Sequence, residues 1–269
     1  MRLAACVLSL FFLVSPAIGQ AAGLATSPNF SVMAPNKVIA DAVVKQAESM
    51  RKEAALEWLG RELSQGQGPT MITVDISSSE DDGLTWPIDC PERKFHHIWL
   101  TTSLSRAVGT TLNHEVVHTV LESYSSPNRL PAWLREGVAS QKDDADRKEI
   151  RQSLLAQWAR DGHWPELRTI FYSPRIGHDD HVGYTVASSV TEFLAERGGK
   201  PRVIEFAAAS QQRGWDRSAQ DYYGFRNIAE LQVSWQTWAL NKIGKQARQP
   251  IATDRKLAES ALVFPTNRY

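Results

Sequence analysis

The pentapeptide His114-Glu115-Val116-Val117-His118 combines residue types that together can bind a metal ion and use it. Two histidines four positions apart on an α-helix project from one face, about 40° apart around the axis, so each can give one nitrogen to a single Zn²⁺. Glu115 lies beside them, where its carboxylate can act on a metal-held water molecule. The alternative is an ordinary amphipathic helix with two surface histidines.

The residues around the pentapeptide favour an α-helix. Apolar side chains recur every fourth position on the side opposite the histidines: Val108, Leu112, Val116 and Val120. This spacing predicts that one face of the helix is buried while the other presents the two imidazoles.

Glu136, eighteen residues after His118, is the candidate for a third ligand. It lies in the segment Leu130-Pro131-Ala132-Trp133-Leu134-Arg135-Glu136-Gly137-Val138-Ala139. Pro131 suits the first turn of a helix, and residues 125–128 before it predict a turn, so a short helical hairpin can return Glu136 to the metal. Two histidines, one glutamate and an open position for water are the ligand pattern of a catalytic rather than a structural zinc site.

These two segments together resemble the gluzincin zinc metallopeptidases, more closely the bacterial peptidase MA-like group than thermolysin itself. The matching stretches are HEVVH at 114–118 and WLREGVA at 133–139. A weaker second match, to the C-terminal helical part of the same group, comprises Tyr184 entering a helix that ends in Gly198-Gly199, then Phe225, Glu230-Leu231 and Trp235. The resemblance covers roughly residues 70–242.

The resemblance implies an α+β, zincin-like fold that is predominantly helical, with a small N-terminal mixed sheet packed on the zinc-binding helix. It implies one Zn²⁺ per chain. It also implies that the strand expected at 95–102 is the sheet edge to which an extended substrate adds itself as a further strand. Tyr184 is expected to donate a hydrogen bond to the developing oxyanion, with His181 as the alternative donor.

The chemistry expected from these residues is hydrolysis of a peptide bond. His114, His118 and Glu136 hold Zn²⁺, which lowers the pKa of its water towards ~7. Glu115 takes the proton as this water attacks the substrate carbonyl and then delivers it to the leaving amine. No Gly-x-Met-x-Asn stretch of the aminopeptidase type precedes the helix, so an endopeptidase is favoured. Two alternatives stay open: an amidase acting on envelope peptides, and a non-catalytic exported module that keeps zinc as a staple and binds a partner.

The composition limits which other classes of protein this chain could belong to. The chain has 269 residues, enough for one substantial domain or two small ones. Lys plus Arg and Asp plus Glu both number 30, so no net field favours nucleic acid or an anionic membrane as a partner. A hydrophobic content of 42% is that of a globular protein with a core. The expected partner is the peptide or protein substrate of the hydrolysis described above.

Residues 1–19 are expected to be a Sec signal peptide. Arg2 precedes an apolar run, and small residues occupy the −3 and −1 positions of a cleavage site after Gly19, with Ala22 as a second cleavage position. A short membrane anchor is the alternative, but the run is too short to span a bilayer comfortably. The protein is therefore expected to be exported, secreted or periplasmic, without stable membrane insertion after cleavage. The mature chain then holds one cysteine, Cys90, either a merely unpaired thiol or a latency switch at the metal's open position.

A single catalytic domain is expected over residues 35–248. A flexible lead-in at 20–34 precedes it, and a polar tail at 249–269 follows it. Its first part, 35–145, contains the sheet and the metal ligands, and its second part, 146–248, is helical. The elements expected in the first part are a helix at 36–63, a strand at 71–76, a solvated acidic loop at 77–83 and a strand at 95–102.

Three further groups of residues are candidates for roles near the metal. The run His178-Asp179-Asp180-His181 is either a solvated loop or a loop that overhangs the cleft. His96 and His97 alternate faces on their strand, so at most one of them can point at the cleft. Ser140, one turn after Glu136, could hold a ligand in place, although thermolysin has a carboxylate at that offset.

Overall fold

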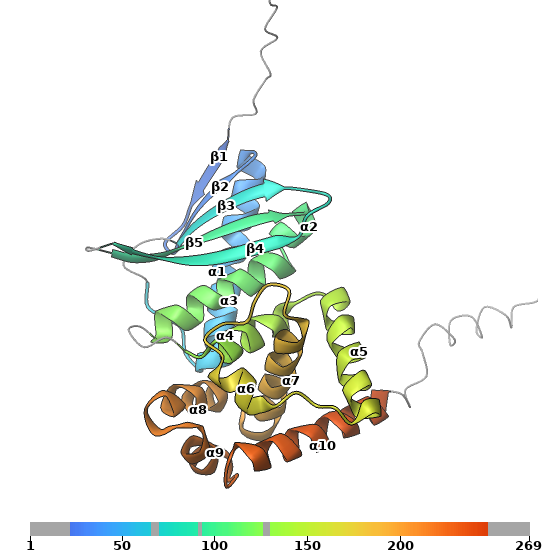
Figure 1. Ribbon diagram of the computed structural model, residues 1–269. Helices are drawn as coiled ribbons and strands as arrows, with labels where there is room; N and C mark the ends of the chain where they lie inside the picture. Colours follow the sequence, from blue (N-terminus) through green and yellow to red (C-terminus); the bar gives the residue numbers. More distant parts are fainter. Residues whose placement is uncertain (1–21, 66–69, 91–92, 126–129, 247–269) are drawn as a thin grey trace, which may run out of the picture.

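The structure is a computed structural model that describes residues 22–65, 70–90, 93–125 and 130–246 (Figure 1). These residues form an α+β fold in which a small, mixed five-stranded sheet precedes a mainly helical part, as the sequence predicts. The expected signal peptide and the expected tail lie outside the described residues. Within the described ranges, no helix has the length and apolar character needed to cross a membrane.

Two strands occupy the segment for which a flexible lead-in is expected. β1 (Gly23–Thr26) and β2 (Phe30–Ala34) pair antiparallel, and Phe30 and Val32 are buried in the core. The lead-in prediction is therefore wrong for these strands. Small residues give the segment a weak two-residue alternation, and its strands are stabilised by pairing with β3 (Thr70–Ile76), far along the chain.

The strand at the edge of the sheet next to the helical part is β4 (Asp82–Cys90), which the sequence analysis does not predict. The strand order is β1-β2-β3-β5-β4, where β5 (Arg93–Thr102) runs parallel to β3 and antiparallel to β4. The prediction that the strand at 95–102 forms the edge is wrong, because β4 folds back on β5 and takes that position.

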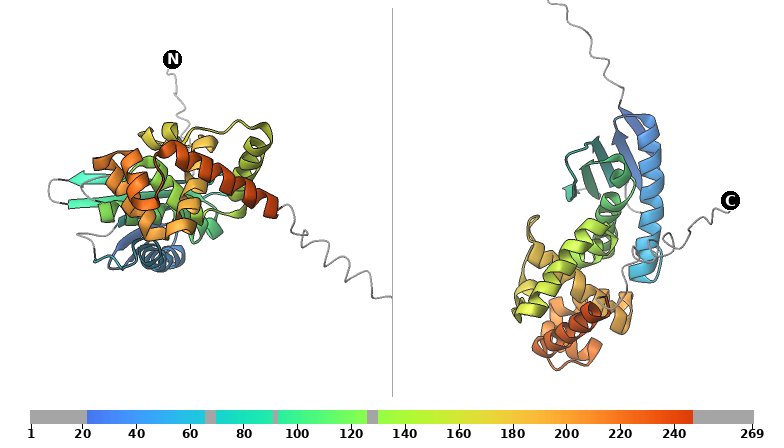
Figure 2. Two further views of the ribbon diagram at one scale, coloured as in Figure 1. Left: turned by 90° about the horizontal axis from the view of Figure 1, so that it is seen from below. Right: turned by 90° about the vertical axis from the view of Figure 1, so that its right-hand side faces the viewer.

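Among the described residues, helices cover one face of the sheet and leave the other open. The long helix α1 (Lys37–Leu59) packs against the covered face, as the right-hand view of Figure 2 shows. It begins where the Asn36 side chain accepts a hydrogen bond from the Ile39 amide, and it ends at Gly60, whose φ of 69° is left-handed. We call the uncovered side of the sheet the outer face.

The helical part follows the sheet in the chain. After α2 (Leu104–Ala107) come α3 (Thr110–Ser125), α4 (Ala132–Ala139), the 3₁₀ turn η1 (Ser140–Lys142), α5 (Ala145–Asp161), α6 (Leu167–Tyr172), α7 (His181–Gly198), α8 (Lys200–Arg213), α9 (Trp215–Tyr223) and α10 (Ile228–Gln246). The helices from α5 to α10 lie in the second part of the domain, which the sequence predicts to be helical. A buried aromatic cluster holds α4, α6, α8 and α9 together: Trp133, Phe171, Phe206 and Trp215.

Candidate metal centre

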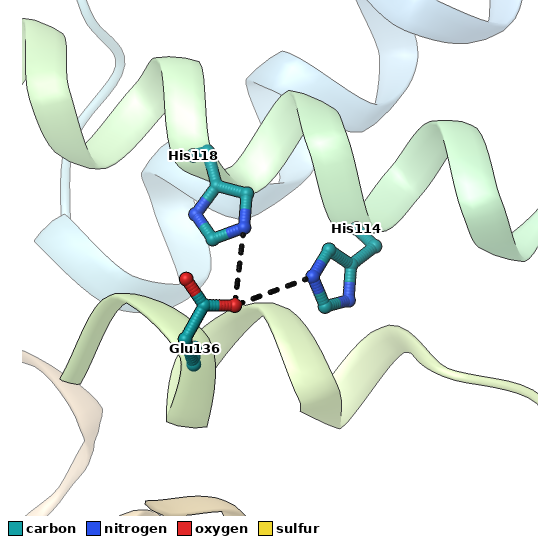
Figure 3. Close-up of side chains that lie close together, drawn as sticks. All are labelled: His114, His118 and Glu136. Carbon is teal, nitrogen blue, oxygen red and sulfur yellow. Dashed lines mark ion pairs between the residues drawn. The ribbon is translucent and has the colours of Figure 1, made fainter. Parts of the chain in front are cut away.

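The three predicted metal ligands lie together between α3 and α4. His114 and His118 project from one face of α3, and Glu136 approaches them from α4 (Figure 3). The Glu136 Oε2 atom is 3.7 Å from His114 Nε2 and 3.5 Å from His118 Nε2. All three side chains offer a ligand atom within 4.8 Å of the others. Of the turn predicted at 125–128 between the two helices, Ser125 is instead the last residue of α3, and the other residues lie outside the described part of the chain.

This geometry fits a small tetrahedral cation. Ligand atoms placed about 2.1 Å from a zinc ion in a tetrahedron are about 3.4 Å from one another, close to the two separations from Glu136. Two imidazole nitrogens and one carboxylate oxygen are also the donor types that zinc takes. His114, His118 and Glu136 are therefore the residues that could hold Zn²⁺.

Asp143 forms a hydrogen bond with the ligand residue His114, and the sequence does not predict this contact. Its Oδ1 lies 2.8 Å from His114 Nδ1, and its Oδ2 accepts a hydrogen bond of 2.9 Å from Arg151 on α5. In the neutral ring that binds a metal, a proton held on Nδ1 leaves Nε2 of His114 unprotonated and directed towards Glu136. Ser140, the expected holder of a ligand, has a buried hydroxyl without a partner among the described residues, so Asp143 takes that role.

The charges at the centre favour cation binding. Burial alone lowers the pKa of His114, but hydrogen bonds with Asp143 and Glu136 outweigh it and raise that pKa to about 10. Burial raises the pKa of Glu136, yet the two histidines hold that pKa well below its ordinary value. The glutamate is therefore ionised, and a metal that replaces the histidine proton must release it to solvent.

Glu115 is buried next to these ligands and is held by the edge strand. Thr85 of β4 donates a hydrogen bond of 2.6 Å to the Glu115 carboxylate. The strand comes this close because Gly83 has no side chain: a Cβ there would lie 2.7 Å from Glu115 Oε1. This fixed carboxylate is the candidate general base, and its contacts with β4 are not visible in the sequence.

Gly137 brings the helix of Glu136 against the helix of Tyr184. A Cβ at Gly137 would lie 2.5 Å from the backbone oxygen of Ala187 on α7, so only glycine permits this approach. Tyr184 stands in the first turn of α7 and lines the same cleft as Glu115 and Glu136. Burial raises the pKa of its phenol, and the carboxylates of Glu136 and Glu115 raise it further. The phenol therefore keeps its proton and can donate a hydrogen bond.

The cleft that contains the metal ligands has a volume of about 450 Å³ and opens to solvent. His178, Asp179 and His181 line it together with Tyr184, while being exposed themselves. Asp180 instead caps α7 by accepting a hydrogen bond from the Gly183 amide. The loop therefore borders the cleft, and three of its four charged or titratable side chains reach the rim.

The two strand histidines lie on opposite faces of β5, as expected. His96 forms a 2.8 Å hydrogen bond with Glu122 on α3, next to Arg135. His97 lies on the outer face, where its ring stacks on Trp99 at a centroid distance of 3.5 Å. Neither histidine belongs to the ligand cluster. Cys90 ends β4, and its side chain lies outside the described part of the structure.

Asp81, in the segment expected to be a solvated loop, is instead the centre of a partly buried network. Its carboxylate accepts hydrogen bonds from the hydroxyls of Thr102 and Thr111 and from the guanidinium groups of Arg106 and Arg147. These bonds outweigh the effect of burial and lower the pKa of Asp81. Residues 77–81 form the predicted loop, but the prediction that Asp81 is only solvated is wrong, because Arg106 of α2 and Arg147 of α5 neutralise its charge.

Comparisons with known proteins add no relative. No protein-family model matches the sequence, and no curated protein matches it. The resemblance to gluzincins therefore stays a hypothesis that rests on the residues themselves.

Proposed function

We propose that this protein is a zinc-dependent hydrolase that cleaves peptide bonds in an extended peptide or protein substrate. The observation that carries the proposal is the position of Glu115. This buried carboxylate is not part of the His114–His118–Glu136 cluster, yet it lies beside it in an open cleft. A site that only stapled the fold would have no use for such a group.

The proposed reaction assigns one role to each side chain. Zinc, when bound, supplies Lewis acidity that polarises a carbonyl and makes a nearby water easier to deprotonate. Glu115 accepts a proton from the attacking water and passes it to the leaving amine nitrogen as the C–N bond breaks. Tyr184 donates its phenolic hydrogen to the carbonyl oxygen as negative charge develops there. Thr85 keeps the Glu115 carboxylate in one orientation throughout.

The substrate is proposed to lie along β4 rather than β5. β4 is the open edge beside the cleft, and Gly83, Leu84 and Thr85 line that cleft. Pro87 lacks an N–H and is tolerated in such an edge strand. An extended peptide that pairs with the edge near Gly83 and Thr85 would pass over Glu115.

An exported binding module that keeps zinc for stability is the second candidate. Structural zinc sites usually close with a fourth Cys or His. Within the described ranges the cluster contains three residues and no fourth, which supports the hydrolase. An amidase acting on envelope peptides would use the same residues and differs only in its substrate. Export, secreted or periplasmic, remains part of the proposal because it depends on residues 1–19.

The test compares Glu115→Gln with Glu149→Gln, a change at an exposed position on α5, on a mixed peptide library after matched zinc loading. We expect Glu115→Gln to keep its zinc and melting temperature but to lose hydrolysis by ~10²–10⁴-fold. Glu149→Gln should behave as wild type. A Glu115→Gln variant that cleaves at the wild-type rate would refute the mechanism, and a zinc-loaded wild type that cleaves no peptide would favour the binding module.

A further inference from the structure

The outer face of the sheet carries large apolar side chains that are exposed. Six of them are between 40% and 60% exposed: Leu24, Met33, Met71, Leu84, Trp86 and Trp99. The strand register makes them neighbours. Leu24 faces Met33 across β1 and β2, Trp99 faces Leu84 across β5 and β4, and Thr73 of β3 lies between the two pairs. The six side chains therefore form a continuous apolar band across all five strands.

Charged groups are scarce on this face. The other described side chains that share it, by alternation along the strands, are Thr26, Ser31, Thr73, Asp75, Asp82, Ile88, Phe95, His97 and Thr101. No lysine or arginine is among the described side chains here, although the whole chain has 30. The two acids, Asp75 and Asp82, lie together at one end of the face. The described side chains of this face therefore offer no cation that would attract nucleic acid or an anionic membrane.

The sheet face that carries the band is about as large as the largest apolar patch that an isolated monomer usually exposes. Five strands about 4.8 Å apart and about six residues long at 3.3 Å each span roughly 24 by 20 Å, or about 500 Å² before side-chain relief is counted. Apolar patches on monomers are at most about 300–600 Å², and a stable interface needs about 800 Å² of accessible surface per partner. With relief from two tryptophans and two methionines, the outer face approaches that requirement.

We propose that two copies of this chain pack together through their outer faces, as two sheets about 10 Å apart. A second copy suits the face because an uncharged apolar band meets its own image without repulsion. A two-fold axis that crosses the strands places the Asp75–Asp82 end of one copy over the opposite end of the other, so the acids stay apart. The proposal does not depend on the metal site, although Leu84 also lines the cleft and brings the interface to its rim.

The experiment measures the association of the mature protein by sedimentation velocity between about 1 and 100 µM. We expect a monomer–dimer equilibrium. Met33→Thr and Trp86→Thr, which lie near opposite edges of the outer face, should each raise the dissociation constant at least tenfold. Threonine suits a strand, so both variants should keep the wild-type far-ultraviolet circular dichroism.

The matched control is Val38→Thr on α1, which removes an equally exposed apolar side chain away from the outer face. It should leave the dissociation constant unchanged. A wild type that stays monomeric at 100 µM overturns the proposal, and binding of an apolar peptide or a vesicle by that monomer would assign the face to another partner. A dimer that Val38→Thr weakens as much as Trp86→Thr also overturns it.

Discussion

Replacement of Asp143 by asparagine tests whether this residue holds His114 for the metal. Asp143 is 4% exposed and has two donors against it, His114 Nδ1 and Arg151 Nη1. Asparagine keeps the size but offers one oxygen and one NH₂ group, so one of these two donors must face the NH₂ group, which cannot accept a hydrogen bond. If His114 changes tautomer to escape this, its proton moves to Nε2, the nitrogen that the metal needs.

The magnitude follows from the burial of Arg151. This guanidinium is 9% exposed, and without the Asp143 charge its remaining hydrogen bond is to the Ser140 backbone oxygen. Loss of one partner of a buried ion pair costs about 3–5 kcal/mol, and asparagine still accepts one bond, so we expect about 3 kcal/mol. The folding equilibrium should change by roughly 150-fold. Zinc affinity should fall ~10–100-fold, as for other residues that orient a histidine ligand.

The assay combines urea unfolding of the metal-free protein with competition for zinc against a chromophoric chelator. The matched control is Asp144→Asn, the same change one residue further along. Asp144 caps α5 and pairs with Arg106, and asparagine caps a helix equally well. This variant should therefore lose less than about 1 kcal/mol of unfolding free energy and keep the wild-type zinc affinity. If both variants lose the same stability and both keep wild-type zinc affinity, the positioning role of Asp143 is refuted.

Three further outcomes follow from the same geometry. Glu136→Gln removes the charge of the third candidate ligand, so elemental analysis should find much less zinc; full loading at unchanged affinity would exclude Glu136. Gly137→Ala should lower the free energy of unfolding by about 1–3 kcal/mol, because its Cβ would overlap the α7 backbone, and an unchanged urea midpoint would contradict that contact. In the metal-free protein the pKa of His114 is raised to about 10. Protonated His114 therefore stabilises the folded state fully below the unfolded pKa near 6.5, and this stabilisation is lost as pH rises through 10. The pKa of Asp143 is lowered, so its ionised carboxylate stabilises the folded state above about pH 4, and this stabilisation is lost as pH falls. Urea unfolding should therefore show maximal stability between about pH 5 and 6.5. A stability that rises steadily to pH 10 would refute the assignment.

The sequence by itself determined the features that depend on local geometry. The four-residue spacing of His114 and His118 places both imidazoles on one face wherever the segment is helical, and α3 is helical. The proline before α4 and the periodic apolar residues likewise predicted the hairpin of the two ligand helices. In the structure Glu136 does lie next to both histidines. Tyr184 was placed by resemblance alone, and it does line the cleft.

Only the tertiary structure decided which residues support that hairpin and which strand borders it. Asp143 lies beyond the end of α4, and it reaches His114 because η1 turns the chain there, which the sequence does not indicate. Gly83 and Thr85 meet Glu115 about thirty residues away because β4 folds back along β5 and becomes the edge. Local spacing determines which side chains share one face of a helix. It carries no information about strand pairing or hydrogen bonds between distant segments, because those depend on where the whole chain returns.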